Sequence, residues 1–151
     1  MKKTLSILLL CSLALPMHSI ASGKKQKSKK TSRVTLKQKG LSGEWILTYI
    51  EHLDVHKDFK QDHIPSIQFD ASLKNLSGND GCNTFARPIK IEGNKIICFG
   101  PFIGTLKACE GSADQKFMDA LKKINTYAMP DDETLDLIAG DIGVLQFSRK
   151  K

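Results

Sequence analysis

Cysteine and histidine are the residue types in this 151-residue chain best suited to chemistry. After the first 40 residues the candidates are Cys82, Cys98, Cys109, His52, His56 and His63. His52 and His56 would face the same way on a helix, as metal ligands can, but no H-E-x-x-H motif and no nearby cysteine accompany them. We therefore interpret the charged stretch 51–63 as a solvated surface loop and expect no metal site there.

A catalytic constellation is missing from the sequence. C-x-x-C, the usual motif of thiol redox enzymes, does not occur, and neither does the G-x-S-x-G elbow of hydrolases. The acidic run 131–133 follows Pro130 and fits a solvated turn better than a pair of catalytic carboxylates. Phosphate-binding loops and dinucleotide fingerprints are absent, so we expect no cofactor. These observations predict a protein that is not an enzyme.

Positive charge is concentrated near the N-terminus. The whole chain carries a formal charge of +7, but residues 22–40 carry +8 without an acid, and residues 41–151 hold 13 basic against 16 acidic residues, or −3. A segment so charged and so poor in apolar residues is predicted to be a disordered spacer. Its lysines are candidate contacts to a polyanion or an anionic membrane: Lys24, Lys25, Lys27, Lys29 and Lys30. Because the spacer has no aromatic residue for base stacking, nucleic acid is not the expected partner, and a plain solvated linker is the alternative.

Residues 1–21 have the composition of a secretory signal peptide. Two lysines precede an apolar run that Pro16 ends, and small residues precede a cleavage site after Ala21. The run is too short to span a bilayer, which needs about 20 residues. We therefore expect export to the bacterial periplasm or cell envelope. Cys11 offers a lipid anchor as a weaker alternative, because leucines rather than a small residue precede it.

Alternating apolar residues predict several short strands. Over residues 41–50, Trp45, Leu47 and Tyr49 are expected to share one face, and residues 64–70 repeat the pattern with Ile67 and Phe69. The turn-forming stretch 77–83 predicts a hairpin or a bulge.

A clearer hairpin is predicted over residues 88–99, where Gly93-Asn94 forms a two-residue turn. That register pairs Ile89 with Cys98 and Ile91 with Ile96, so the Cys98 side chain is expected to face the core. Two last strands are expected near 134–139 and 143–148, with four inward residues: Leu135, Leu137, Leu145 and Phe147.

A single helix is predicted over about residues 113–126. Ser112 and Gln115 have the spacing of a capping box, and Phe117, Leu121 and Ile124 follow at helical spacing. Many short strands with one helix and no alternation of strands and helices predict a mostly β, α+β fold. We expect a small antiparallel β-barrel-like domain over residues 41–151.

In order along the chain, the segments L-S-G-E-W-I-L-T-Y-I, S-G-N-D-G-C-N and G-T-L-K-A-C resemble the META domain family, which includes the bacterial heat-shock protein HslJ and the Leishmania Meta proteins. The resemblance covers nearly all of residues 41–151. Its most specific positions are Gly81, Cys82, Asn83, Thr105 and Cys109. It implies a barrel-like domain, often exported or lipid-anchored, with links to stress, antibiotic tolerance or virulence and no agreed catalytic activity.

The three cysteines outside the leader allow three disulfide pairings. The hairpin register turns Cys98 inward, whereas Cys82 and Cys109 both lie in turn-like motifs of the family, so we favour a Cys82–Cys109 disulfide. The bridge would close a loop worth roughly 3–4 kcal/mol in the chain-entropy model. Two packed thiols remain the alternative, because a sequence does not give the Cβ geometry that a bridge needs.

Two functional hypotheses follow. The first is an exported, monomeric, non-enzymatic envelope protein that binds a small apolar ligand or a protein partner through its sheet face or barrel mouth. The second is a surface-attachment module whose basic spacer binds an anionic lipid surface or a polyanion.

Overall fold

The structure is a computed structural model that describes residues 40–151. The expected signal peptide, Cys11 and the spacer lysines lie outside the described residues and stay predictions. Within residues 40–151, the helices are too short and too polar to cross a membrane.

Nine strands, two α-helices and one 3-10 turn make up the part of the chain that the structure describes. In chain order they are β1 (Gly43–Ile50), α1 (Val55–Asp58), the 3-10 turn η1 (Gln61–His63), β2 (Ser66–Phe69), β3 (Asn75–Asn79), β4 (Thr84–Glu92), β5 (Lys95–Cys98), β6 (Ile103–Gly104), α2 (Ala113–Lys123), β7 (Thr126–Ala128), β8 (Thr134–Ala139) and β9 (Ile142–Arg149).

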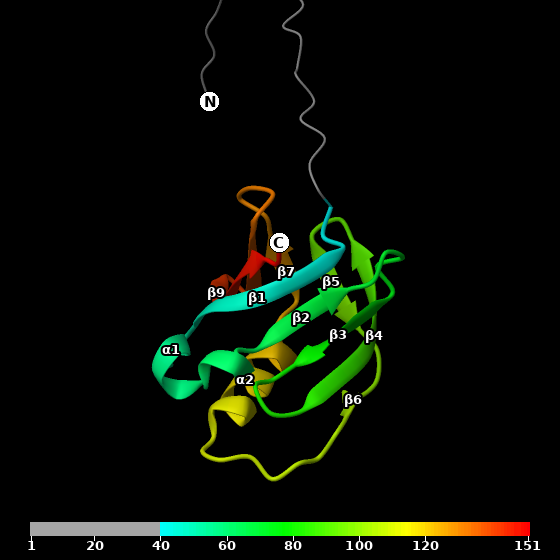
Figure 1. Cartoon of the computed structure of the whole chain (residues 1–151). Coiled ribbons are helices and arrows are strands. Elements are labelled where there is room, and N and C mark those ends of the chain that lie inside the picture. Colours follow the sequence, from blue (N-terminus) through cyan, green and yellow to red (C-terminus); the bar gives the residue numbers. More distant parts are fainter. Residues whose placement is uncertain (1–39) are drawn as a thin grey trace, which may run out of the picture. The chain divides into compact units, whose positions relative to one another are not determined.

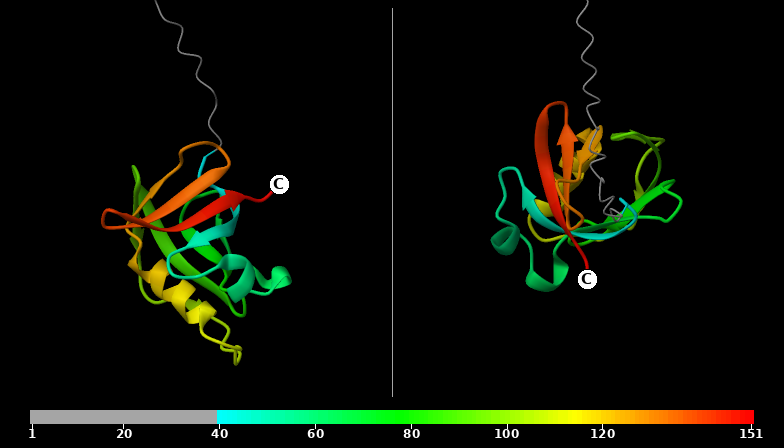
Figure 2. Two further views of the ribbon diagram at one scale, coloured as in Figure 1. Left: turned by 90° about the vertical axis from the view of Figure 1, so that its left-hand side faces the viewer. Right: turned by 90° about the horizontal axis from the view of Figure 1, so that it is seen from above.

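Eight of these strands close into an antiparallel barrel (Figure 1). Neighbouring strands follow the order β3, β2, β1, β9, β8, β7, β5, β4, and the pairing of β3 with β4 completes the ring. Strand β6 lies beside β4 as a ninth strand. Helix α2 lies at one end of the barrel (Figure 2). The predicted antiparallel barrel with one substantial helix is therefore confirmed.

The two predicted hairpins at the middle and end of the chain form as expected. Around the Gly93-Asn94 turn, Ile89 lies opposite Cys98 and Ile91 opposite Ile96. In the last hairpin, Leu135 lies opposite Phe147 and Leu137 opposite Leu145, and all four side chains are buried. The expected turn near residue 80 joins β3 to β4, and Ile67 and Phe69 of β2 are buried as predicted.

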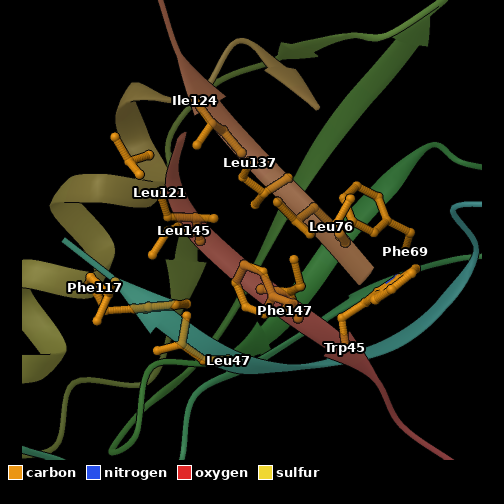
Figure 3. Close-up of a cluster of buried hydrophobic side chains, with 14 of the residues drawn as sticks. Trp45, Leu47, Phe69, Leu76, Phe117, Leu121, Ile124, Leu137, Leu145 and Phe147 are labelled. Atoms are coloured by element: carbon orange, nitrogen blue, oxygen red, sulfur yellow. The ribbon is translucent and has the colours of Figure 1, made fainter. Parts of the chain in front are cut away.

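Apolar side chains from the strands and from α2 fill the barrel (Figure 3). Phe117 and Leu121 of α2 are fully buried, and the Phe117 ring lies 6.4 Å from that of Phe147. Trp45 and Phe69 pack on the other side of Phe147. Each such side chain removed from water contributes roughly 1.5–3 kcal/mol, so this cluster is the main source of stability.

A bulge in β1 overturns the predicted position of Tyr49. Leu47 lies opposite Phe147, but Tyr49 rather than Thr48 lies opposite Gln146, so the strand carries one extra residue. A bulge reverses the side-chain alternation that follows it. The Tyr49 side chain is consequently 49% exposed, and Ile50, predicted to lie on the opposite face, points into the core.

Helix α2 begins where the sequence predicts but ends earlier. Ser112 is its N-cap, yet the Ser112 side chain makes no capping hydrogen bond, so the predicted capping box with Gln115 is wrong. The helix stops at Lys123, because Thr126–Ala128 must be extended to pair with β8. Ile124 keeps its predicted buried position as the first extended residue.

The segment 51–63 is more ordered than the predicted loop. It holds α1 and η1, and Val55 and Phe59 anchor it to the core. Its three histidines are exposed. In the described part of the chain, no group of three or more metal-ligating side chains comes together.

Candidate functional site

Cys82 and Cys109 form a disulfide, with their Cα atoms 6.1 Å apart, which confirms the favoured pairing. The bond joins the turn between β3 and β4 to the loop that leads from β6 to α2. Because that loop contains no regular secondary structure from Thr105 to Ser112, a covalent link has the largest effect on its freedom there.

Asn83 is the hydrogen-bonding centre of this junction. Its Oδ1 accepts hydrogen bonds from the Thr105 hydroxyl (2.9 Å) and the Lys107 amide (2.8 Å). Its Nδ2 donates to Cys109 Sγ (3.1 Å) and to the Lys107 carbonyl (3.4 Å). One amide side chain therefore holds the loop at three successive points, beside the disulfide.

The turn that carries Asn83 is itself fixed by Asp80 and Gly81. The buried Asp80 carboxylate accepts hydrogen bonds from the amides of Cys82 (2.9 Å) and Asn83 (2.6 Å). Gly81 has a φ of +96°, and a Cβ there would lie 2.8 Å from the Phe59 ring and 2.9 Å from the His63 carbonyl. Only glycine fits both the backbone angle and the space.

We call Cys82, Asn83, Thr105 and Cys109 the clasp. The Thr105 hydroxyl donates to Asn83 and accepts from the Thr84 amide (3.1 Å). Every polar group of these side chains is engaged with another part of the junction, and the two sulfurs are bonded to each other. The arrangement fixes a loop; it contains no nucleophile placed beside a base.

A surface pocket of about 660 Å³ lies against the clasp. Its walls come from α1, η1, the disulfide, the loop 107–111 and the start of α2. Both signs of charge line it, and the exposed pair of Lys60 Nζ and Glu110 (3.5 Å) connects η1 to the loop. Among the three histidines, only His63 lines this pocket. Its mixed, hydrated lining differs from the apolar cavity that a small apolar ligand prefers.

The segment 99–107, which we call the strap, is unusual in exposing large apolar side chains. Phe99 is 49% exposed, Ile103 71% and Leu106 fully exposed. Thr105 and Lys107 of the clasp junction hold its second half in place. The sequence analysis missed this surface, and the available signal was the pair of isolated apolar residues flanking Gly104-Thr105 outside any alternating pattern.

Comparison with protein families gives a match to the META domain over residues 23–151. The chain belongs to the META domain family. The resemblance inferred from Gly81, Cys82, Asn83, Thr105 and Cys109 is thereby confirmed. The match begins 18 residues before the domain start predicted at residue 41.

Solved structures support the fold of this META domain. A protein from Burkholderia xenovorans solved by NMR is 18% identical, with a TM-score of 0.54 over 91% of this chain and 99% of that one. A DUF4847 family protein from Bacteroides vulgatus is 20% identical, with a TM-score of 0.47 over 73% and 94% of the two chains. No curated protein matches the sequence.

The five motif positions of the META domain come together at one place, whereas Cys98 lies elsewhere. Cys98 is a free thiol on β5 that packs against the core but is only half-buried, so its predicted role as a small core residue holds in part. Burial raises the pKa of the Cys98 thiol, and the nearby Arg87 guanidinium opposes that rise. The acidic run 131–133 is a turn in which Asp131 accepts from the Glu133 amide (2.8 Å), and this bond lowers the Asp131 pKa.

Proposed function

We propose that this META domain is an exported, non-enzymatic binding module of the cell envelope that docks a protein partner on the strap. The predicted signal peptide supports export, and the Cys82–Cys109 disulfide suits an oxidising compartment. The resemblance to stress-related family members makes a role in stress or antibiotic tolerance the natural setting for such a partner.

The observation that carries this proposal is the exposure of Phe99, Ile103 and Leu106 on one short segment. Clustered exposed apolar side chains in a small domain mark interaction sites. The clasp fixes the segment before any partner arrives, so less conformational entropy is lost on binding. A loop that served only to connect β6 to α2 would need neither the apolar residues nor the clasp.

A protein partner is favoured over a small apolar ligand because of how the barrel is filled. Side chains such as Trp45, Phe117 and Phe147 are fully buried inside it. The pocket beside the clasp has charged walls rather than apolar ones. An apolar ligand would have to displace core side chains, at a cost of several kcal/mol each.

Site-specific photocrosslinking in the native envelope tests the proposal. We would place p-benzoylphenylalanine at the positions of Ile103 and Leu106, and at the control positions of Tyr49 and Ile142, which are also exposed and apolar. We expect one discrete protein adduct from the strap positions and none from the controls. The purified adduct protein should then bind the wild-type chain and lose at least about tenfold in affinity with Leu106→Asp.

Equal labelling from strap and control positions would overturn the proposal. So would native mass spectrometry of gently extracted protein that showed a bound lipid-sized molecule and no protein adduct. In that case the small-ligand hypothesis would replace it.

A second candidate function rests on the sequence of the spacer. Its +8 charge could hold the −3 domain against an anionic membrane or polyanion. Deleting residues 22–40 should then abolish binding to vesicles that contain phosphatidylglycerol at low salt. Unchanged binding by the deletion variant at two salt concentrations would exclude this function.

A further inference from the structure

We propose that strand β6 binds its partner by strand addition: an extended segment with alternating apolar side chains and one acidic residue pairs with the free edge of β6, and the acid faces Lys107. This inference rests on the proposed function and specifies the binding mode and the partner's chemistry. Three features of the strap carry it, namely its edge, its side chains and its charge.

The outer edge of β6 is unoccupied. Strand β6 stands at the end of the strand order, and within residues 40–151 it pairs only with β4. The Thr105 amide donates to the Thr84 carbonyl (3.0 Å), so Thr105 is hydrogen-bonded to β4. In an antiparallel ladder the neighbouring residue turns its N–H and C=O to the other side. The exposed Gly104 therefore presents an unpaired donor and acceptor to a further strand.

The side chains around this edge lack the features that normally prevent strand addition. Natural edge strands are shielded by charged residues, by proline or by a covering element. Residues 102–106 have no charge and no proline, and Ile103 and Leu106 extend into solvent. Pro101, which has no N–H, marks where the available edge begins. An edge of this kind matches strand addition, in which backbone bonds give affinity and side chains give specificity.

The charge of the strap indicates the charge of its partner. Residues 93–109 contain no acid, and their charged residues are Lys95 and Lys107. No carboxylate of the described residues forms an ion pair with Lys107, although its backbone is held by Asn83. The Lys107 ammonium is thus fixed at its base and free at its tip. A carboxylate on the incoming strand is its natural counterpart.

The test is an NMR titration of the ¹⁵N-labelled chain, residues 22–151, with a synthetic peptide. The peptide is acetyl-Thr-Val-Asp-Val-Thr-Val-amide, and its control carries N-methyl groups on the valines, which removes backbone donors without removing apolar surface. We expect amide shifts and slowed hydrogen exchange at Gly104 and Leu106 with the first peptide. Since β6 is short, binding should be weak, with a dissociation constant of about 1 mM. Shifts of equal size with the N-methylated peptide would overturn strand addition.

A charge exchange tests the acidic preference. Lys107→Glu should weaken binding of the aspartate peptide by about two- to fivefold and strengthen binding of a peptide with lysine in place of aspartate, as expected for an exposed ion pair. Lys123→Glu, at the exposed end of α2, is the matched control and should change neither. Equal effects of the two variants would show that net charge, rather than Lys107, selects the peptide.

Two further outcomes separate the possible occupants. If Gly104 becomes protected as protein concentration rises without peptide, a second copy of the chain occupies the edge and the inference is wrong. If the crosslinking experiment at Leu106 yields a partner but the peptides never shift Gly104, the proposed function stands and strand addition fails. If neither experiment gives a signal, both fail.

Discussion

The barrel is closed in two different ways at its two ends. At the entry end, where residue 40 leads into β1, Leu41, Trp45 and Arg149 make a buried, non-covalent closure. At the opposite end, the clasp holds an exposed loop with a disulfide and one asparagine. The first arrangement closes the core, and the second shapes a surface.

Arg149 explains how the entry end works without a covalent bond. Its guanidinium lies 4.0 Å from the centre of the Trp45 ring. It also donates to the carbonyls of Asp132 (2.7 Å), Ser42 (3.1 Å) and Gly40 (3.0 Å). One side chain from the last strand thus joins three segments. Damage to this end should therefore reduce the stability of the whole barrel, whereas damage to the clasp should leave the barrel intact.

The largest expected effect is that of Trp45→Ala. The side chain is fully buried and its Nε1 donates to the Leu41 carbonyl (2.9 Å). Removing it should cost about 3–5 kcal/mol of unfolding free energy, measured by urea denaturation. Trp45→Phe, which keeps a ring below Arg149, should lose less. Tyr49→Ala, on the same strand but beyond the bulge, should lose less than about 1 kcal/mol. A similar loss for Tyr49→Ala and Trp45→Ala would contradict the assigned bulge.

The second effect is loss of the disulfide in the double variant Cys82→Ser, Cys109→Ser. We expect a loss of roughly 3–4 kcal/mol, because the unfolded chain gains freedom. NMR shifts should be confined to residues 80–84 and 103–111, since Asn83 still holds the loop. Dithiothreitol should destabilise the wild type and leave the double variant unchanged. Shifts spread through β8 and β9 would show that the clasp also supports the core.

The third effect is that of Arg149→Ala, which removes one ring contact and three hydrogen bonds from a charged donor. We expect a loss of about 2–3 kcal/mol. Arg149→Lys should recover less than half of it, because an ammonium can neither stack flat on Trp45 nor reach three carbonyls. Full recovery by lysine in thermal unfolding would mean that charge alone matters there.

The two ends also differ in how far they could be predicted from the sequence. The turn at Gly93-Asn94 sets its hairpin register locally, so the partners of Ile96 and Cys98 were predictable from neighbouring residues. The family motif likewise pointed to Cys82 and Cys109. In contrast, Arg149 meets residues more than 100 positions away, and no local pattern marks it.

The errors have the same origin. The face of Tyr49 depends on a bulge whose partner is Gln146 in the last strand, so alternation within β1 alone gave the wrong side. The exposure of Leu106 depends on where Asn83 and the disulfide hold the loop. Residues whose positions are set by distant segments were thus the ones that sequence patterns could not place.

The smallest expected effect concerns acid stability at the entry end. Asp70, in the turn that follows β2, accepts hydrogen bonds from the Ser72 hydroxyl (2.6 Å) and from the amides of Lys74 (2.8 Å) and Asn75 (3.1 Å). These bonds, led by that from Ser72, lower the Asp70 pKa from 3.8 to about 2.

Because the folded-state pKa of Asp70 is the lower one, its stabilising contribution is complete above the unfolded-state value and is lost as pH falls from near 4 to about 2. Asp70→Asn should flatten this part of the stability profile and change little at pH 7, as measured by urea denaturation across pH 2–5. Asp62→Asn, an exposed carboxylate beside the clasp pocket, should leave the slope unchanged. If Asp62→Asn flattened the acid limb instead, the acid-sensitive turn would lie at the clasp end, and the entry end would depend on apolar packing and Arg149 alone.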